Sequence, residues 1–173
     1  GTIGNFGVLV NDALLMTSFP RRAEVYTGTG AISDAAVRAV AAPRGIEPWC
    51  YLFSLYGRPE LIELNTRIVT TAFEASGARL IAGVHDPMSV NELTLQAFSL
   101  LNWIGSGGLA WFAPVAPCTG ADVAKQNRLA RAIMDAHGMD FFSGATFNGR
   151  EVLNVMPLVF NRDDADERRR ARA

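Results

Sequence analysis

Few residues of this chain have both the type and the spacing that catalysis requires. The histidines, His85 and His137, have no carboxylate or serine at a local spacing typical of a triad or metal pair. His85 lies beside Asp86 in a predicted turn and is a candidate acid–base group, although a loop histidine without a role is the simpler interpretation. His137 ends a predicted helix, where a cation complements the helix dipole, and Glu60 and Glu63 flank a helix start. We therefore predict neither catalytic residues nor a metal site in this chain.

Motifs that bind nucleotides are also missing from the sequence. No Gly-x-Gly-x-x-Gly follows a predicted strand, and the glycines after Ser106 lack the lysine and the helix of a phosphate-binding loop. The cysteines, Cys50 and Cys118, lie far apart and have no histidines at zinc-binding spacing. We interpret the glycines as a flexible joint and the cysteines as free thiols in a reducing compartment.

One strand has a polar residue where an apolar one is expected. The segment 151–160 alternates so that one face carries Val152, Asn154, Met156 and Leu158. The amide of Asn154 must find hydrogen-bond partners or lose stability. It is either a structural residue bonded to a nearby loop or a polar group presented to a ligand on an apolar sheet face. Pro157 cannot donate to a ladder, which predicts an edge or a bulge.

The composition limits the classes of partner. Hydrophobic residues make up 49% of the 173-residue chain, and the formal net charge is −1. The charge excludes a basic nucleic-acid surface, and no apolar run reaches the roughly 18 residues of a membrane span. The acidic and basic residues between 163 and 172 are typical of a solvated helix face. The apolar content indicates a well-filled core, or a surface covered by another domain, a subunit or a flat cofactor.

The elements that would position these residues form an α+β pattern. We predict helices over residues 5–19, 34–42, 59–76, 90–101 and 121–137, and strands over residues 49–56, 79–84, 109–113, 139–147 and 151–160. The first strand is expected to be buried. The helix over 59–76 is expected to bury a stripe made by Leu61, Leu64, Ile68, Thr71 and Ala72. The helix over 121–137 is expected to carry Val123, Ala130, Ile133, Met134 and His137 along one face.

The order β-α-β-β after residue 108 predicts the fold class. Asn148-Gly149 joins two strands in a hairpin, so we expect a ferredoxin-like, antiparallel or mixed sheet with helices mainly on one face. We expect residues 1–173 to form one domain. Because the sequence begins Gly1-Thr2-Ile3, without methionine and without a signal-peptide pattern, it reads as a processed or excised piece.

An ordered set of motifs resembles a known family. The motifs are Gly1-Thr2-Ile3, Ser33-Asp34, Trp49 with Leu55-Tyr56-Gly57 and Pro59-Glu60, Trp111-Phe112-Ala113-Pro114-Val115, Thr119-Gly120-Ala121-Asp122, Met139-Asp140-Phe141, Gly149-Arg150-Glu151 and Leu158-Val159-Phe160-Asn161-Arg162. Together they cover nearly the whole chain. They resemble the cap domain of the vanillyl-alcohol oxidase and p-cresol methylhydroxylase flavoproteins.

This resemblance implies a function for a larger protein. In the family, an FAD-binding domain holds the cofactor, and the cap covers the flavin ring and shapes a pocket for a para-substituted phenol. The flavin takes a hydride from the benzylic carbon, and the electrons pass to oxygen or to a cytochrome. The implied partners are therefore a phenolic small molecule, an FAD-binding domain, a cytochrome in some relatives and a second copy in a homo-oligomer. Nucleic acid and membrane are not expected partners.

The chain departs from the family in two respects. It lacks the FAD-binding domain and the later segments in which the catalytic tyrosine and arginine of the family would lie. In addition, the strand position that bonds covalently to flavin in some relatives aligns with Asn154 or, one residue earlier, with Leu153, and neither is a nucleophile. We therefore expect non-covalent FAD, with Asn154 near the flavin ring and Met156 at the substrate.

Two alternatives stay open. The chain could be a non-enzymatic ferredoxin-like module that binds a ligand or dimerises, or the cap of an FAD-linked 2-hydroxy acid dehydrogenase. The compartment, cytoplasmic or periplasmic, does not follow from the sequence.

Overall fold

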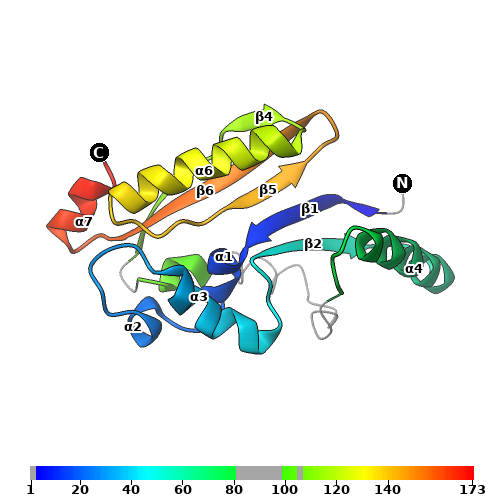
Figure 1. Cartoon of the computed structure of the whole chain (residues 1–173), viewed down its shortest axis with the longest axis horizontal. Coiled ribbons are helices and arrows are strands. Elements are labelled where there is room, and N and C mark those ends of the chain that lie inside the picture. Colours follow the sequence, from blue (N-terminus) through cyan, green and yellow to red (C-terminus); the bar gives the residue numbers. More distant parts are fainter. Residues whose placement is uncertain (1–2, 81–98, 105–106) are drawn as a thin grey trace.

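An antiparallel sheet organises the chain in a computed structural model that describes residues 3–80, 99–104 and 107–173 (Figure 1). Its strands are β1 (Ile3–Asn11), β2 (Trp49–Leu55), β3 (Gly107–Phe112), β4 (Val115–Pro117), β5 (Gly144–Phe147) and β6 (Glu151–Asn161). The order is β2-β1-β5-β6-β3, and β4 also pairs with β6. Every pairing between these strands is antiparallel. The predicted α+β class is confirmed, whereas a specifically ferredoxin-like arrangement stays a prediction.

The helices lie between these strands in the sequence, except for the last one, which follows β6. They are α1 (Asp12–Met16), α2 (Arg22–Val25), α3 (Asp34–Ala41), α4 (Pro59–Ala75), α6 (Gly120–Ala136) and α7 (Ala165–Arg170), with 3-10 turns η1 (Ala42–Arg44) and η2 (Ser99–Asn102). The predicted helices over 34–42, 59–76 and 121–137 are confirmed within one or two residues. Side-chain caps explain the starts of α3 and α6, because Ser33 and Thr119 accept hydrogen bonds from backbone amides three residues on.

The predicted helix over residues 5–19 is wrong. The chain forms β1 and then the short helix α1, whose N-cap Asn11 accepts a hydrogen bond from the amide of Leu14. β1 pairs with β2 on one side and with β5 on the other. These pairings join residues far apart in the sequence, so they override an apolar spacing that also suited a helix.

Other predicted elements differ in extent. Arg79 and Leu80 lie outside any strand, and residues 81–84 of that predicted strand lie outside the described residues. The predicted helix over 90–101 lies mostly outside them too, and its end forms η2. Only Gly144–Phe147 of the strand predicted over 139–147 is a strand. The strand predicted as buried, β2, buries only Cys50, because β2 pairs with β1 alone among the described strands.

The predicted buried stripe on α4 is also wrong. Leu61, Leu64 and Ile68 are 48%, 43% and 57% exposed. A different face of α4 packs on the sheet, where Phe73 stacks on Tyr51 at a centroid distance of 5.6 Å. The sequence contains two apolar faces on this helix, and periodicity does not say which of them meets the sheet. Along α6, Ile133 is 60% exposed whereas the adjacent Met134 is buried, so the face predicted to carry both is only partly covered.

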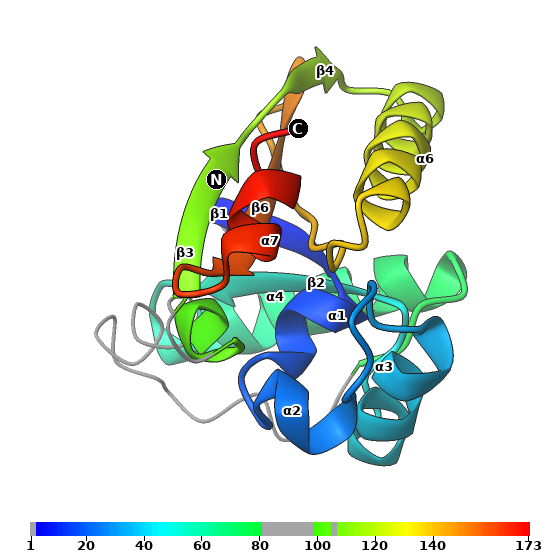
Figure 2. The ribbon, with the colours of Figure 1, turned by 90° about the vertical axis from the view of Figure 1, so that its left-hand side faces the viewer.

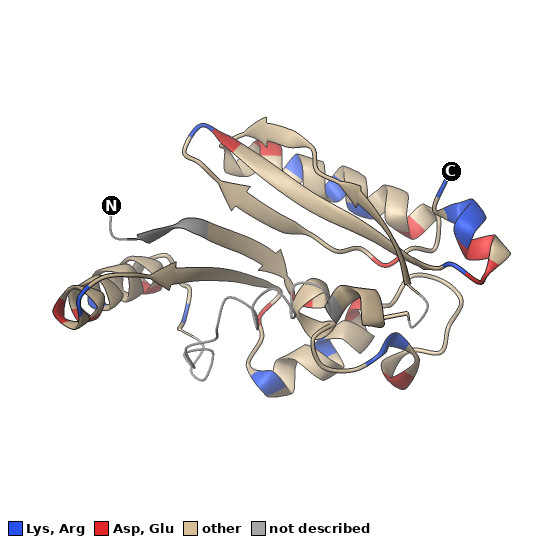
Figure 3. Ribbon diagram, turned by 180° about the vertical axis from the view of Figure 1, so that it is seen from behind, with Lys and Arg blue, Asp and Glu red and all other residues tan. Residues whose placement is uncertain are grey.

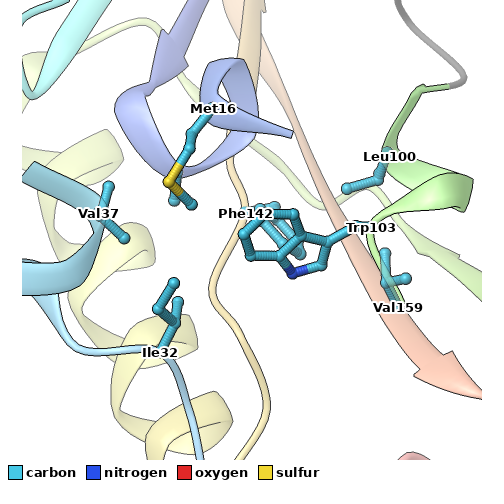
Figure 4. Close-up of a cluster of buried hydrophobic side chains, with 8 residues drawn as sticks. Met16, Ile32, Val37, Leu100, Trp103, Phe142 and Val159 are labelled. Atoms are coloured by element: carbon cyan, nitrogen blue, oxygen red, sulfur yellow. The ribbon is translucent and has the colours of Figure 1, made fainter. Parts of the chain in front are cut away.

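Two apolar clusters pack on opposite sides of β6. On one side, Met156 packs with Met134 of α6 in a cluster that also contains Met139 and Phe141. On the other side, Val159 packs in a cluster with Met16, Ile32, Val37, Leu100, Trp103 and Phe142 (Figure 4). The helix α6 therefore covers one face, along β5 and β6, and α1 with η2 covers part of the other (Figure 2). Helices thus pack on both faces rather than mainly on one.

Candidate functional site

Strand β6 presents different chemistry on its two faces. Leu153 is 39% exposed, whereas the adjacent Asn154 is fully buried on the side of α6. β6 pairs with β5 over 152–155 and with β4 over 151–153, so the orientation of this segment is fixed from both sides. Because successive side chains of a strand point to opposite faces, the two alignment positions identified in the sequence lie on different surfaces.

The amide of Asn154 is bonded inside the protein. The hydroxyl of Ser143 lies 2.8 Å from Asn154 Oδ1 and 2.9 Å from Asn127 Oδ1, so its single hydrogen can be donated to either oxygen. Asn154 Nδ2 donates to Asn127 Oδ1 at 3.1 Å. These contacts agree with the interpretation of Asn154 as a structural residue. Its partner Asn127 belongs to α6, and its partner Ser143 lies just before β5. A role of Asn154 beside a flavin stays a prediction.

Met156 is also enclosed. It is fully buried and lies in the cluster with Met134, Met139 and Phe141 under α6. Its neighbour Pro157 pairs with Trp111 of β3 but lies beyond the last residue of β6 that pairs with β5. Among the described strands, β6 thus has a partner on one side only at Pro157, which agrees with the edge position predicted for this proline.

An apolar surface lies on the face of the sheet opposite α6. We call it the open face; Leu153 lies there opposite Val115 of β4 and Thr146 of β5. Val115 is 59% exposed, and Trp111 of β3 is 60% exposed on the same face. Figure 3 shows that the strands carry few charged residues along their length. The apolar side chains of the open face can therefore contact a flat aromatic group, and Leu153, Val115 and Trp111 themselves offer no nucleophile, acid or base.

The residues of β6 on the open face are the odd-numbered ones, such as Leu153. The polar Asn154 marks the even-numbered side in the sequence, whereas the odd-numbered side near Leu153 is apolar like an ordinary core strand. Only the pairing with β4 and β3 shows that this side remains open near Leu153.

A second apolar concavity lies beside α6, on the face opposite Leu153. This groove has a volume of about 510 Å³ and is lined in part by Leu9, Trp49, Val123, Asn127 and Phe147. Cys118 lies at the groove and is an exposed free thiol, while Cys50 is a buried one. The prediction of two free cysteines is confirmed, and burial raises the pKa of the Cys50 thiol.

The other residues singled out in the sequence do not converge on a site. His137 is the C-cap of α6, as its position predicted, and Glu60 and Glu63 are exposed on α4. His85 lies outside the described residues. Within the described ranges, no group of three or more potential metal ligands occurs. The helices described also include none that is long and apolar enough to cross a membrane.

A buried ion pair was not foreseen from the sequence. Asp140 accepts hydrogen bonds from Arg22 Nε at 2.8 Å, Trp103 Nε1 at 2.8 Å and the backbone amide of Ile32 at 2.7 Å. Arg22 also donates to the carbonyl oxygens of Gly28 and Gly30. Every contact of Asp140 holds a neighbouring segment in place, so this cluster has a structural role.

Comparison with known proteins gives a consistent result. No family model matches the chain. The flavoprotein subunit of 4-cresol dehydrogenase (hydroxylating) from Pseudomonas putida is 29% identical over an aligned length of 163, and the match covers 88% of this chain and 31% of that protein. The structure of p-cresol methylhydroxylase with substrate bound has a TM-score of 0.83 at 27% identity and covers 96% of this chain and 35% of that one.

A further solved structure shows the same fold. The 4-ethylphenol oxidase of Gulosibacter chungangensis, in complex with isoeugenol, has a TM-score of 0.78 at 20% identity and covers 95% of this chain. The chain is therefore similar in sequence and fold to one part of the p-cresol methylhydroxylase flavoprotein. It spans about a third of the length of these relatives.

Proposed function

We propose that the chain is the substrate-facing cap of an FAD-dependent oxidoreductase that oxidises para-substituted phenols. The support is the match over nearly the whole chain to a protein described as the flavoprotein subunit of a 4-cresol dehydrogenase. The solved structures of similar fold contain a bound substrate and isoeugenol, respectively. The partners of the whole protein would be an FAD-binding domain, a phenolic small molecule and an electron acceptor, either oxygen or a cytochrome.

The observation that carries this proposal is the open face around Leu153. Leu153, Val115 and Trp111 are large, apolar and 39–60% exposed on one side of the sheet. Such a surface is suited to cover the ring of a flavin and to line an apolar pocket for a phenol. Of the two alignment positions, we assign the flavin-facing one to Leu153, because the side chain of Asn154 lies on the α6 side of the sheet and is bonded to Ser143 and Asn127.

The residues present define what this chain would contribute. When bound, the flavin supplies the hydride acceptor for the benzylic carbon of the phenol. The side chains of Leu153, Val115 and Trp111 would orient the aromatic ring by contact and exclude water from it. None of them can transfer a proton at neutral pH, so acid–base groups would have to come from another part of the enzyme. None is a nucleophile, so the flavin would form no covalent bond with these three side chains.

Expression of the full natural reading frame tests the proposal. The purified protein should show flavin absorbance, and 4-ethylphenol should bleach it in the absence of oxygen, whereas lactate and glycolate should not. Leu153→Arg should lower kcat/KM for the phenol, because it places a charge in the apolar pocket, and Leu129→Ala on the outer surface of α6 should not. A colourless protein, or one bleached by lactate and not by the phenol, would contradict the proposal.

A further inference from the structure

The polar triad of Asn127, Ser143 and Asn154 lies directly behind the open face. Ser143 and Asn154 are fully buried, and Asn127 extends to them from the half-buried side of α6. The three contacts that join their side chains measure 2.8, 2.9 and 3.1 Å. Burial of polar groups in an apolar layer is costly unless they bond to one another, so the triad is stable only when all its members meet.

The neighbours of Asn154 do not by themselves distinguish the two faces of β6. Val152, Leu153, Val155 and Met156 are all apolar, and α6 could pack on either set. A shift of one residue in the pairing of β6 would exchange every side chain between the faces. In that alternative, Asn154 would lie on the open face, and the triad partners would lose hydrogen bonds at about 1–3 kcal/mol for each unsatisfied group. Asn154 is thus the residue within 152–156 whose side chain favours one orientation, in addition to the backbone pairing with β4 and β5.

We propose that Asn127 is a positioning residue for the flavin-facing side of β6. Its Oδ1 atom receives Asn154 Nδ2 and the hydroxyl of Ser143, and through them fixes which residues of β6 lie on the open face. Asn127 itself contacts neither flavin nor substrate and acts through Asn154. This inference rests on the function proposed above, because it assigns the cofactor to the face that carries Leu153.

The inference is tested by separating stability from catalysis in the full-length enzyme. Asn127→Leu removes the acceptor and should lower both Tm and kcat/KM. The triple variant Asn127→Leu, Ser143→Ala, Asn154→Leu leaves no unpaired polar group, so its Tm should return toward that of the wild type. Its kcat/KM for 4-ethylphenol should nevertheless remain roughly 10–100-fold low, since small displacements of a pocket wall have effects of this size. Its flavin absorption maxima should also differ from the wild-type maxima.

Asn127→Asp is the conservative variant, because it keeps an acceptor oxygen. Leu129→Ala is the matched control, because it changes the exposed side of the same helix. Asn127→Asp should recover most of the kcat/KM lost in Asn127→Leu, and this comparison decides the matter if the triple variant does not fold. A triple variant with wild-type kcat/KM and spectrum, or equal kcat/KM in the Asp and Leu variants, would overturn the inference. A wild-type enzyme without flavin absorbance would instead overturn the proposed function, before any variant is compared.

Discussion

Leu153 and Asn154 are consecutive in β6, yet one is 39% exposed on the open face and the other is fully buried behind it. The side chain of Asn154 bonds to Asn127 and Ser143, so it cannot turn to the open face without breaking these contacts. The two positions that the family resemblance singled out therefore lie on different surfaces of this chain, and the cofactor contact that we propose concerns Leu153 alone.

The first prediction concerns the attachment of flavin. Leucine has no nucleophilic atom, and a carboxamide does not form a stable bond with the flavin ring. After acid precipitation of the full-length protein, the yellow colour should be in the supernatant, where its absorbance measures the released FAD. Denaturation in guanidinium followed by filtration is the control for incomplete release. A pellet that stays yellow after both treatments would show a covalent bond and contradict this expectation.

The second prediction concerns the buried ion pair. Asp140→Ala leaves Arg22, the indole N–H of Trp103 and the amide of Ile32 without their acceptor. Removal of one partner from a buried pair should lower the free energy of unfolding by about 3–5 kcal/mol, measured by urea denaturation. Asp135→Ala breaks an exposed pair with Arg131 and should cost less than about 1 kcal/mol. Equal losses in the two variants would show that Asp140 is not structurally important.

The third prediction concerns the pH dependence of α7. The backbone amides of Glu167 and Asp166 donate to Asp164 and lower the pKa of this carboxyl group. The pKa of Asp164 is lower in the folded state than in the unfolded state. The ionised carboxyl group therefore stabilises α7 fully above the ordinary aspartate pKa of about 4, and this stabilisation is lost as the pH falls through the lowered pKa of the folded state. Amide exchange in α7, corrected for the intrinsic rate, should accelerate over that range.

Two variants separate the charge of Asp164 from its capping. Asp164→Asn retains an acceptor without a charge, so it should remove this pH dependence, while Asp164→Ala should raise exchange in α7 at every pH. A wild-type acid response that persists unchanged in Asp164→Asn would assign it to another group.

The fourth prediction concerns the cysteines. In the isolated chain, Cys118 is exposed and should react with a maleimide at pH 7.5 much faster than Cys50, which is buried and has a raised pKa. Mass spectrometry of a time course in native buffer gives the order, and labelling in urea should make the two rates similar. Faster native labelling of Cys50 would contradict the position of β2 against Ala41 and Ile46.

Sequence reasoning was most accurate for features that depend on near neighbours. Ser33, Thr119 and the glycines after α4 and α6 marked helix ends, because caps are contacts between residues a few positions apart. The Asn148-Gly149 turn likewise marked the hairpin that joins β5 and β6. Residues 5–19 were assigned wrongly, since their strand requires partners from residues 49–55 and 144–146.

The sequence by itself determined that β6 has two chemically different sides and that α4 has an apolar stripe. It also determined that no nucleophile occupies position 153 or 154. Only the tertiary structure decided that Leu153 lies on the open side, that Asn154 bonds to Asn127, and that Leu61, Leu64 and Ile68 stay exposed. Periodicity records which residues share a face, whereas the choice of face depends on packing partners that are distant in the chain.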